Sequence, residues 1–392
     1  MTQDLQITFY GGVGTVTGAN FLLETPTTKI LVDCGLLQGT LDSHEQNRAS
    51  WDYDPKSVDF LFLTHAHLDH IGRVCKLVRD GFRGVIFSTP ETKELAIVML
   101  LDALKVMDMN SRNGLELEGE RELPLYEMAD YHQAFSQWKT IPYHTKTKIN
   151  DEFDVYLKDA GHILGSSMFE FIHDGRKVVF TGDSGNSPAP LLRDTEKITD
   201  ADYLIMDSVY GDRNHEPKEE RDERFKQIVT ETIEKRGAII IPAFSIERTQ
   251  VILYQLNNLV EEKKIPSIPI FLDSPLGTKV TEIYKRTPKD FNTIVQKEIS
   301  EGDNIFHFPK LSITHGRRES EEIVKTPNPK IIIAGSGMST GGRIVSHEIN
   351  FLPDPKSTIL LMGYQALGTL GRKIQDKQKE IEIKGQIISI PA

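Results

Sequence analysis

The chain has 392 residues, of which 39% are hydrophobic and 26% are charged, and its formal net charge at pH 7 is −11. This composition is typical of a globular protein, and the length exceeds what one hydrophobic core usually supports, so we expect two domains. No stretch reaches ~18 uninterrupted apolar residues and the N-terminus lacks a signal-peptide pattern, which predicts a cytoplasmic protein without a membrane segment. The negative charge argues against the wrapping of duplex DNA, although it leaves room for a locally basic groove. Two cysteines, Cys34 and Cys75, are too few for a disulfide framework, so we expect them to be small buried residues.

Short β-like runs dominate the first part of the chain: QITFYGG, NFLLET, KILVDCG, VDFLFLT and GVIFST. Residues 91–109 then carry a helical apolar face, and residues 115–138 continue as a charged, mostly helical stretch. Strand patterns resume in FDVYLKDAGH, MFEFIH, KVVFTGD and YLIMDS. We therefore predict a layered α/β unit that extends to about residue 207.

The pattern changes after residue 208. An apolar helical stripe from Phe225 to Ile233 is followed by Gly237, a typical helix stop. AIIIPA and PIFLDSP are predicted strands on either side of a helix at residues 246–262. KIIIAGSG and STILLMGY are further continuous apolar runs, typical of parallel strands with both faces covered. The alternation predicts a doubly wound α/β domain at residues 209–371.

The densest chemical signal is THAHLDH at residues 64–70, which holds three of the chain's twelve histidines beside an aspartate. Because the preceding VDFLFLT is a predicted strand, His65 and His67 project to the same side of extended backbone and can bind one ion. Asp69 and His70 lie one turn further on, where a helix is expected to begin, and point to a second position. Neutral imidazole and carboxylate are ligands for zinc and neighbouring divalent ions. The alternative is a chance group of surface histidines.

Two more polar residues directly follow predicted strands, His162 in DAGHILGS and Asp183 in VVFTGDSGN. Each alone has an ordinary structural explanation: His162 could be a buried histidine with its hydrogen bonds made within the core, and Asp183 could be a turn residue. Together with the first cluster they complete a site in which Asp183 bridges two cations about 3.5–4 Å apart. A hydroxide between such cations would be available at neutral pH, because a bound divalent ion lowers the pKa of water to about 7.

These residues resemble the ligand pattern of the metallo-β-lactamase superfamily: His65, His67, Asp69, His70, His162 and Asp183, with Asp33 in the early LVDCG. The resemblance implies an αββα sandwich with two Zn²⁺ ions at one edge, Mn²⁺ being an alternative ion. It also implies that Asp33 orients metal ligands instead of binding metal.

Later segments resemble the β-CASP branch of this superfamily, which includes RNase J-like nucleases and the polyadenylation-factor endonuclease. These segments are MDSVYGDR, IPAFSIERTQ, LDSPLG and AGSGMSTGGR. The resemblance implies that Asp207 hydrogen-bonds a metal-binding histidine, the alternative being a simple acid at a strand end. The expected fold is therefore α/β, with a metallo-β-lactamase αββα sandwich at residues 1–208 and an inserted doubly wound β-CASP domain at residues 209–371. Residues 372–392 are expected to return to the first domain, where the chain looks truncated.

The glycine-rich segment GSGMSTGGR follows a predicted buried strand, so its backbone N–H groups can approach an anion closely. A tight turn without ligand is the alternative. Arginine suits bidentate contact with a phosphodiester. The residues expected to contact a substrate phosphate are Arg248, Ser336, Gly337, Ser339, Arg343 and His347. With the metal centre they suggest a groove between the domains for single-stranded RNA.

The lead hypothesis is a zinc-dependent ribonuclease in which a metal-bridging hydroxide hydrolyses phosphodiester bonds of single-stranded RNA. Its expected catalytic residues are Asp69, Asp183, Asp207 and Asp33. Two histidines that the branch normally carries after the inserted domain have no counterpart, since His215, His307, His315 and His347 stand in other contexts. We therefore expect a weakened second metal site and impaired turnover.

Two rival functions stay open: a non-catalytic RNA-binding or scaffold protein, and a hydrolase of a small thioester or lactam. His144 and His215 are expected at the surface. A homodimer is compatible with the sequence, and the choice between endonuclease and 5′-exonuclease stays open.

Overall fold

The computed structural model of the protein describes residues 5–39, 42–112, 116–117, 120–121, 123–214 and 217–391. The chain divides into two compact units, Met1–Asp212 and Arg213–Ala392. None of the described helices has the length and apolar character needed to cross a bilayer.

Two β-sheets form the centre of the first unit, one with the strand order β1-β2-β3-β4-β5-β8 and one with the order β13-β12-β11-β10-β9. The strands of the first sheet are β1 (Gln6–Gly11), β2 (Asn20–Glu24), β3 (Lys29–Val32), β4 (Phe60–Phe62), β5 (Val85–Ser88) and β8 (Trp138–Thr140). Those of the second are β9 (Thr147–Lys148), β10 (Asp154–Asp159), β11 (Ser167–His173), β12 (Arg176–Phe180) and β13 (Tyr203–Ile205). All nine strands expected in this unit are therefore present.

The helices of the first unit are α1 (Ser43–Arg48), η1 (Pro55–Ser57), α2 (Leu68–Ile71), α3 (Val74–Arg79), α4 (Pro90–Arg112) and α5 (Met128–Ser136). Helix α4 confirms the predicted helix at residues 91–109. The prediction of a mostly helical stretch at residues 115–138 is wrong, because its described part contains a two-stranded hairpin, β6 (Glu116–Leu117) and β7 (Glu120–Arg121), before α5 begins. Charge alone suggested the helix, and charge does not distinguish a helix from a hairpin.

The hydrophobic core of the first unit lies between its two sheets. Alternate residues of the strands point inward, and the ring of Phe62 lies 5.3 Å from that of Phe169 and 4.9 Å from that of Phe171, measured between centroids. Cys34 and Cys75 are both buried, as predicted. The sandwich thereby holds the C-terminal ends of β4 and β12 in one place.

The outer face of the second sheet carries Glu170, which is 4% exposed and forms ion pairs of 3.1 Å with Lys158 and Lys177. Residues 186–201, which contain no helix, run over these lysines, because Lys158 donates to the carbonyl of Lys197 at 2.8 Å and Lys177 to that of Thr199 at 3.3 Å. This part of the sandwich is therefore covered by extended chain.

The second unit is built on a parallel sheet with the strand order β16-β15-β17-β14-β18. Its strands are β14 (Ala238–Pro242), β15 (Ile270–Asp273), β16 (Leu311–Ile313), β17 (Lys330–Ala334) and β18 (Thr358–Ile359). Its helices are α6 (Lys218–Glu234), α7 (Arg248–Glu261), α8 (Pro275–Lys285), η2 (Pro288–Asp290), α9 (Thr293–Ser300), α10 (Arg317–Lys325), α11 (Ile344–Phe351) and α12 (Leu370–Gln375).

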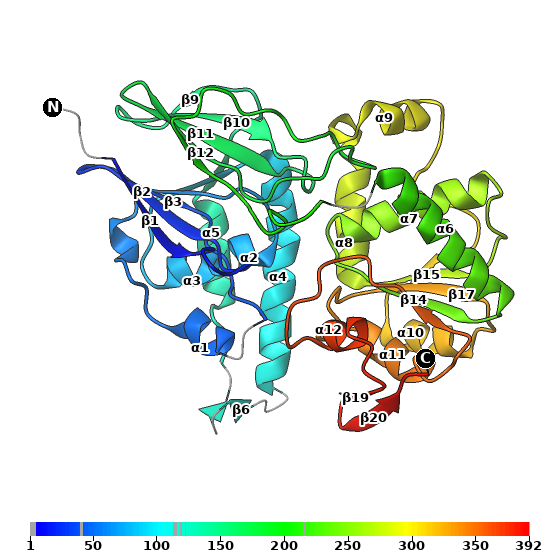
Figure 1. The fold of residues 1–392 in the computed structure, drawn as a ribbon. Coiled ribbons are helices and arrows are strands. Elements are labelled where there is room, and N and C mark those ends of the chain that lie inside the picture. The colour runs from blue at the N-terminus through cyan, green and yellow to red at the C-terminus, as the bar shows by residue number, and fades with distance from the viewer. Residues whose placement is uncertain are drawn as a thin grey trace. The chain divides into compact units, whose positions relative to one another are not determined.

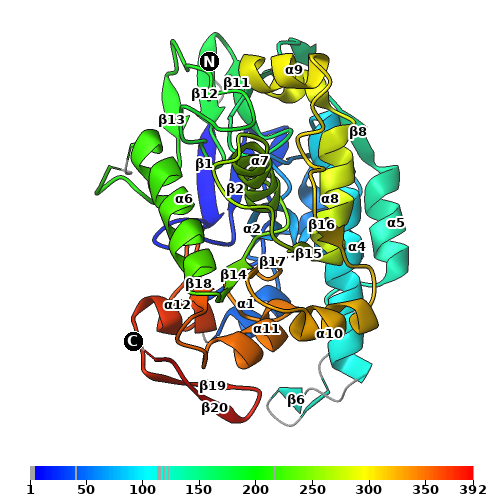
Figure 2. The same ribbon diagram turned by 90° about the vertical axis from the view of Figure 1, so that its right-hand side faces the viewer.

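Helices cover both faces of this parallel sheet. Figures 1 and 2 show α6, α7 and α8 on one side of β14, β15 and β17, and α10, α11 and α12 on the other. The central strands AIIIP and KIIIA are accordingly buried at every position. The predicted doubly wound domain is confirmed.

The end of the chain packs on the second unit, which differs from the expected return of residues 372–392 to the first domain. Strands β19 (Glu380–Ile383) and β20 (Gln386–Ser389) form a hairpin whose Ile381, Ile383 and Ile388 join the core around β14 and β17. The alternating EIEI pattern has one apolar face, which the helical side of the parallel sheet can bury.

This packing predicts unequal effects of two substitutions in the hairpin. Ile381→Ala should lower the free energy of unfolding by about 2–4 kcal/mol, because Ile381 is 3% exposed in the core. The matched control Ile387→Ala should change it by no more than about 0.5 kcal/mol, because Ile387 is 73% exposed. Urea unfolding measures both, and equal effects would contradict the packing.

Candidate metal centre

Three strand ends bring the predicted metal ligands together. After β4 the chain stays extended to His67, whose backbone (φ −69°, ψ 147°) precedes the first turn of α2, so Asp69 and His70 turn to a second position as predicted. His162 follows β10, and Asp183 follows β12 by three residues. Residues separated by more than a hundred positions thus meet at one edge of the sandwich.

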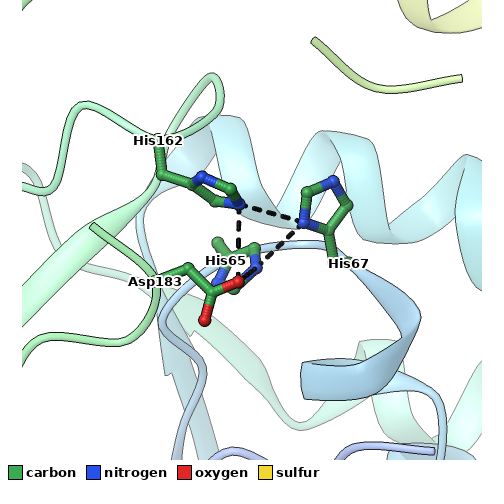
Figure 3. Close-up of side chains that lie close together, drawn as sticks. All are labelled: His65, His67, His162 and Asp183. Atoms are coloured by element: carbon green, nitrogen blue, oxygen red, sulfur yellow. Dashed lines mark hydrogen bonds and ion pairs between the residues drawn. The ribbon is translucent and has the colours of Figure 1, made fainter. Parts of the chain in front are cut away.

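His65, His67, His162 and Asp183 form the first group of donor atoms, which point toward one another in Figure 3. Nδ1 of His67 lies 3.1 Å from Nε2 of His65 and 3.2 Å from Nε2 of His162. Oδ2 of Asp183 lies 3.8 Å from Nε2 of His65 and 3.6 Å from Nε2 of His162. An ion with four tetrahedral ligands at about 2.05 Å separates the ligand atoms by about 3.3 Å, so this donor set fits such an ion.

Asp69, His70 and Asp183 form a second group. Nε2 of His70 lies 3.2 Å from Oδ1 of Asp183 and 3.9 Å from Oδ2 of Asp69. Asp183 therefore faces the first group with Oδ2 and the second with Oδ1, an arrangement in which one carboxylate can bridge two cations.

Asp33, which directly follows β3 and is fully buried, is hydrogen-bonded to His70 of the second group. Its carboxylate accepts hydrogen bonds of 2.8 Å from the backbone N–H of Thr64, the hydroxyl of Thr64 and Nδ1 of His70. A proton fixed on Nδ1 leaves the lone pair of Nε2 directed toward Asp183 and Asp69. Asp33 thus contacts a candidate ligand and stands in neither donor group.

The protonation preferences follow from burial and the close charges. Burial lowers the pKa of His65 well below its ordinary value and so favours the neutral imidazole that binds metal. Burial would also lower the pKa of His70, but the carboxylates of Asp183 and Asp33 outweigh it and raise that pKa well above its usual value. Burial raises the pKa of Asp69 to about 6, while the three imidazoles around Asp183 outweigh its burial and lower its pKa.

Several residues that position these ligands escaped the sequence analysis. Thr89 and Thr92, both fully buried at the start of α4, donate from their hydroxyls to the carbonyl of Gly165 at 2.7 and 2.8 Å. The hydroxyl of Ser166 accepts from the backbone N–H of His162 at 3.1 Å. The turn that carries His162 is thus fixed by hydrogen bonds from the start of α4 and by a bond within the turn itself. No spacing in the sequence indicated that α4 contacts this turn.

Asp207 does not make the predicted hydrogen bond to a metal-binding histidine. Its carboxylate accepts from the backbone N–H of Val209 at 2.8 Å, and its own N–H donates to the hydroxyl of Thr181 at 3.2 Å. The structure therefore agrees with the alternative, an acid that caps the turn at the end of β13.

Three residues predicted to contact a substrate phosphate bind buried carboxylates instead, Arg343 and His347 that of Asp273 and Ser339 that of Glu348. The carboxylate of Asp273 accepts from Nη1 of Arg343 at 2.5 Å and bonds Nε2 of His347 at 2.7 Å, and Ser339 donates to Glu348. His347 is 1% exposed and Ser339 2%, so neither can reach a substrate phosphate in this structure. Arg343 is tied to Asp273 because that carboxylate is fully buried and needs a charged partner.

The other three predicted phosphate contacts lie in different surroundings. Ser336 and Arg248 are half-buried. Gly337 is buried, and the position where a side chain would begin lies against the ring of Phe244. Among the remaining histidines, His144 is exposed and pairs with Glu196 at 2.7 Å, and His215 lies outside the described residues.

The role of Asp33 can be tested by metal binding. We expect the wild type to bind one divalent ion tightly and a second more weakly, because the second group offers only three donors. Asp33→Asn should weaken the second ion by about 10–100-fold, since the hydrogen bond that orients His70 is disturbed. Asp200→Asn is a matched control, because Asp200 has the same left-handed backbone (φ 59° against 60°) but is exposed. Calorimetric Zn²⁺ titration measures both, and an unchanged second affinity would refute the role.

The buried carboxyl of Glu348 predicts a pH dependence of stability. Burial raises its pKa from 4.5 to about 7, against the opposing hydrogen bond from Ser339. The folded chain therefore holds this proton to higher pH than the unfolded chain, and stability falls as pH rises from about 4.5 to 7. Relative to Glu348→Gln, the wild type should lose up to about 3 kcal/mol of unfolding free energy across that range and then level off. Urea unfolding at a series of pH values measures this, and parallel profiles would contradict it.

Comparison with known proteins agrees with this architecture. The family model of the metallo-beta-lactamase superfamily domain matches residues 22–199, and that of the Beta-Casp domain matches residues 249–374. A solved structure of a protein of unknown function from Enterococcus faecalis V583 covers 93% of this chain and 88% of its own, with a TM-score of 0.50 and 13% identity. At that identity the likeness concerns the fold alone.

Sequence relatives extend over almost the whole chain. Ribonuclease TTHA0252 of Thermus thermophilus is 34% identical over 388 residues, which cover 99% of this chain and 86% of the relative. The RNase J-like protein of Methanocaldococcus jannaschii is 30% identical, covering 97% and 85%. Transcription termination factor FttA of Methanosarcina mazei is 31% identical, and the chain spans 60% of its length. The chain belongs to the metallo-β-lactamase superfamily, in the branch that carries a β-CASP domain.

Proposed function

We propose that this protein is a divalent-metal-dependent ribonuclease that hydrolyses phosphodiester bonds of single-stranded RNA, with zinc as the ion and manganese as the alternative. The observation that carries the proposal is the two-sided position of Asp183, which faces His65 and His162 with one oxygen and His70 with the other. Relatives that are named ribonuclease and RNase J-like protein support a nuclease.

In this proposal His65, His67 and His162 would hold one cation and Asp69 and His70 the other, and Asp183 would offer an oxygen to each. Two bound cations would supply Lewis acidity and a water nucleophile that ionises at neutral pH. Asp69 would orient the attacking water and accept its proton. Asp33 keeps the proton of His70 on Nδ1, so that Nε2 stays a ligand.

The described histidines of the second unit, His307, His315 and His347, belong to neither donor group. The second metal position then has only three protein donors, Asp69, His70 and Asp183. We expect slow turnover because this position would bind its ion weakly. Contact of a substrate phosphate with Arg248 and Ser336 stays a prediction, as do the cytoplasmic location and a homodimer.

Incubation of end-labelled single-stranded RNA with Zn²⁺ or Mn²⁺ tests the proposal. The wild type should cleave, and Asp69→Ala/His70→Ala should reduce the rate by on the order of a thousandfold, because a metal ion contributes several kcal/mol to the stabilisation of the transition state. His307→Ala is the control, because His307 is exposed and lies in neither donor group.

The other outcomes of the same assay identify the rival functions. RNA binding without cleavage by the wild type would support a non-catalytic RNA-binding or scaffold protein. Neither binding nor cleavage would support a hydrolase of small thioesters or lactams.

A further inference from the structure

The first unit contains a pocket of about 680 Å³ that is separate from the metal centre. It lies between the end of α1, the helix α3 and the segment before α5, and residues that line it include Arg48, Trp51, Tyr53, Lys76, Arg79 and Asp80. Pockets of this size hold small molecules or parts of larger ligands. Its lining combines aromatic rings with cationic side chains.

The ring of Trp51 is fixed in the pocket wall. Its Nε1–H donates to Oδ2 of Asp80 at 2.7 Å, and Nζ of Lys76 lies 4.4 Å from the ring centroid. Lys76 also donates to Asp80 at 2.7 Å and to the carbonyl of Ala49 at 3.0 Å. The indole is half-buried, so part of it stays accessible, and its orientation is set before any ligand binds.

The charge of the pocket suits an anion. Three cations, Arg48, Lys76 and Arg79, line it together with two anions, Asp54 and Asp80, in a chain of net charge −11. Asp80 is already neutralised by Lys76. Arg79 is exposed, and its Nη1 donates to the carbonyl of Leu125 at 3.1 Å, which holds the guanidinium at the rim.

Arg73, which follows the helix that carries Asp69 and His70, links this helix to Trp51 of the pocket. Arg73 stacks on Trp51, with 4.9 Å from its guanidinium carbon to the ring centroid, and its Nε donates to the carbonyl of Gly35 at 2.5 Å. The neighbouring Cys34 donates its backbone N–H to the carbonyl of His70 at 2.7 Å. A single side chain therefore separates the pocket from the segment that packs against α2.

From these contacts we infer that the pocket is a second RNA contact, which holds one nucleotide of single-stranded RNA away from the bond that is cut. The base stacks on Trp51 and its phosphate binds Arg48 and Arg79. Aromatic rings stack with any base, and one guanidinium group can donate two hydrogen bonds to a phosphate. The site would therefore bind RNA without preference for a base sequence. The inference rests on the proposed ribonuclease function, because it assumes RNA as the ligand.

Binding of a fluorescein-labelled single-stranded oligoribonucleotide, measured by anisotropy in EDTA, tests the site without cleavage. Trp51→Ala should weaken binding about tenfold through lost stacking, and Trp51→Phe should retain most of the affinity. Arg48→Ala/Arg79→Ala should weaken binding and flatten its salt dependence. Arg176→Ala, which removes an exposed arginine from the β11–β12 hairpin, is the matched control and should bind like the wild type.

Tryptophan fluorescence gives a second readout. The chain has two tryptophans, and Trp138 is 3% exposed, so Trp138→Phe leaves Trp51 as the only emitter. The oligoribonucleotide should quench this emission over the concentration range in which anisotropy rises. Inorganic phosphate and AMP should each require at least tenfold higher concentrations, since each supplies only part of the contact.

Unchanged RNA affinity of Trp51→Ala and of the double arginine variant, both folded by circular dichroism, would overturn the inference. So would equal potency of phosphate or AMP, which would make the pocket an anion or mononucleotide site. Should Trp51→Ala fail to fold, the arginine variant and the fluorescence titration decide alone. Failure of the wild type to cleave RNA with Zn²⁺ or Mn²⁺ would refute the proposed function separately, because the binding series is measured without metal.

Discussion

The carboxylate of Asp183 lies between two groups of side chains and gives each of them one oxygen. This is possible only because β4, β10 and β12 end at the same edge of the sandwich, where the turns after them present His65, His162 and Asp183 to one another. The aromatic core between the sheets, with Phe62 against Phe169 and Phe171, sets the relative positions of these strand ends. Packing between the two sheets therefore determines the distances between the ligands.

The same arrangement of a buried aspartate at the end of a strand serves two different purposes in the two units. Asp33 after β3 bonds Thr64 and Nδ1 of His70, and leaves Nε2 of that imidazole turned toward Asp183. Asp273 at the end of β15 bonds Ser320, Arg343 and Nε2 of His347. In the second unit the imidazole is enclosed, and within the described residues its Nδ1 has no hydrogen-bond partner. One network thus orients a candidate ligand, whereas the other connects β15 with α10 and α11.

The net charge of −11 and the proposed RNA substrate are compatible because charge is distributed unevenly. Around Trp51 the pocket is lined by three cations and two aspartates, and one of these cations, Lys76, pairs with Asp80 and lies over the indole ring. An acidic chain can therefore offer a local surface that attracts phosphate, while the remaining surface keeps it apart from other polyanions.

The sequence by itself determined the strands with clear apolar runs, the doubly wound second unit and the set of donor residues, because hydrophobic periodicity and ligand chemistry are local properties. The short strands β8, β9 and β16 carry no such run and were not predicted. His65 and His67 at i and i+2 on extended backbone, followed by the first turn of α2, follow from seven consecutive residues. Only the tertiary structure decided what depends on distant partners. Arg343 and His347 occur in a segment that suggests phosphate binding, yet they pair with Asp273, some seventy positions away. The hairpin β19–β20 joined the second unit because its apolar face met β14 and β17, and the EIEI pattern specifies a buried face without specifying what buries it.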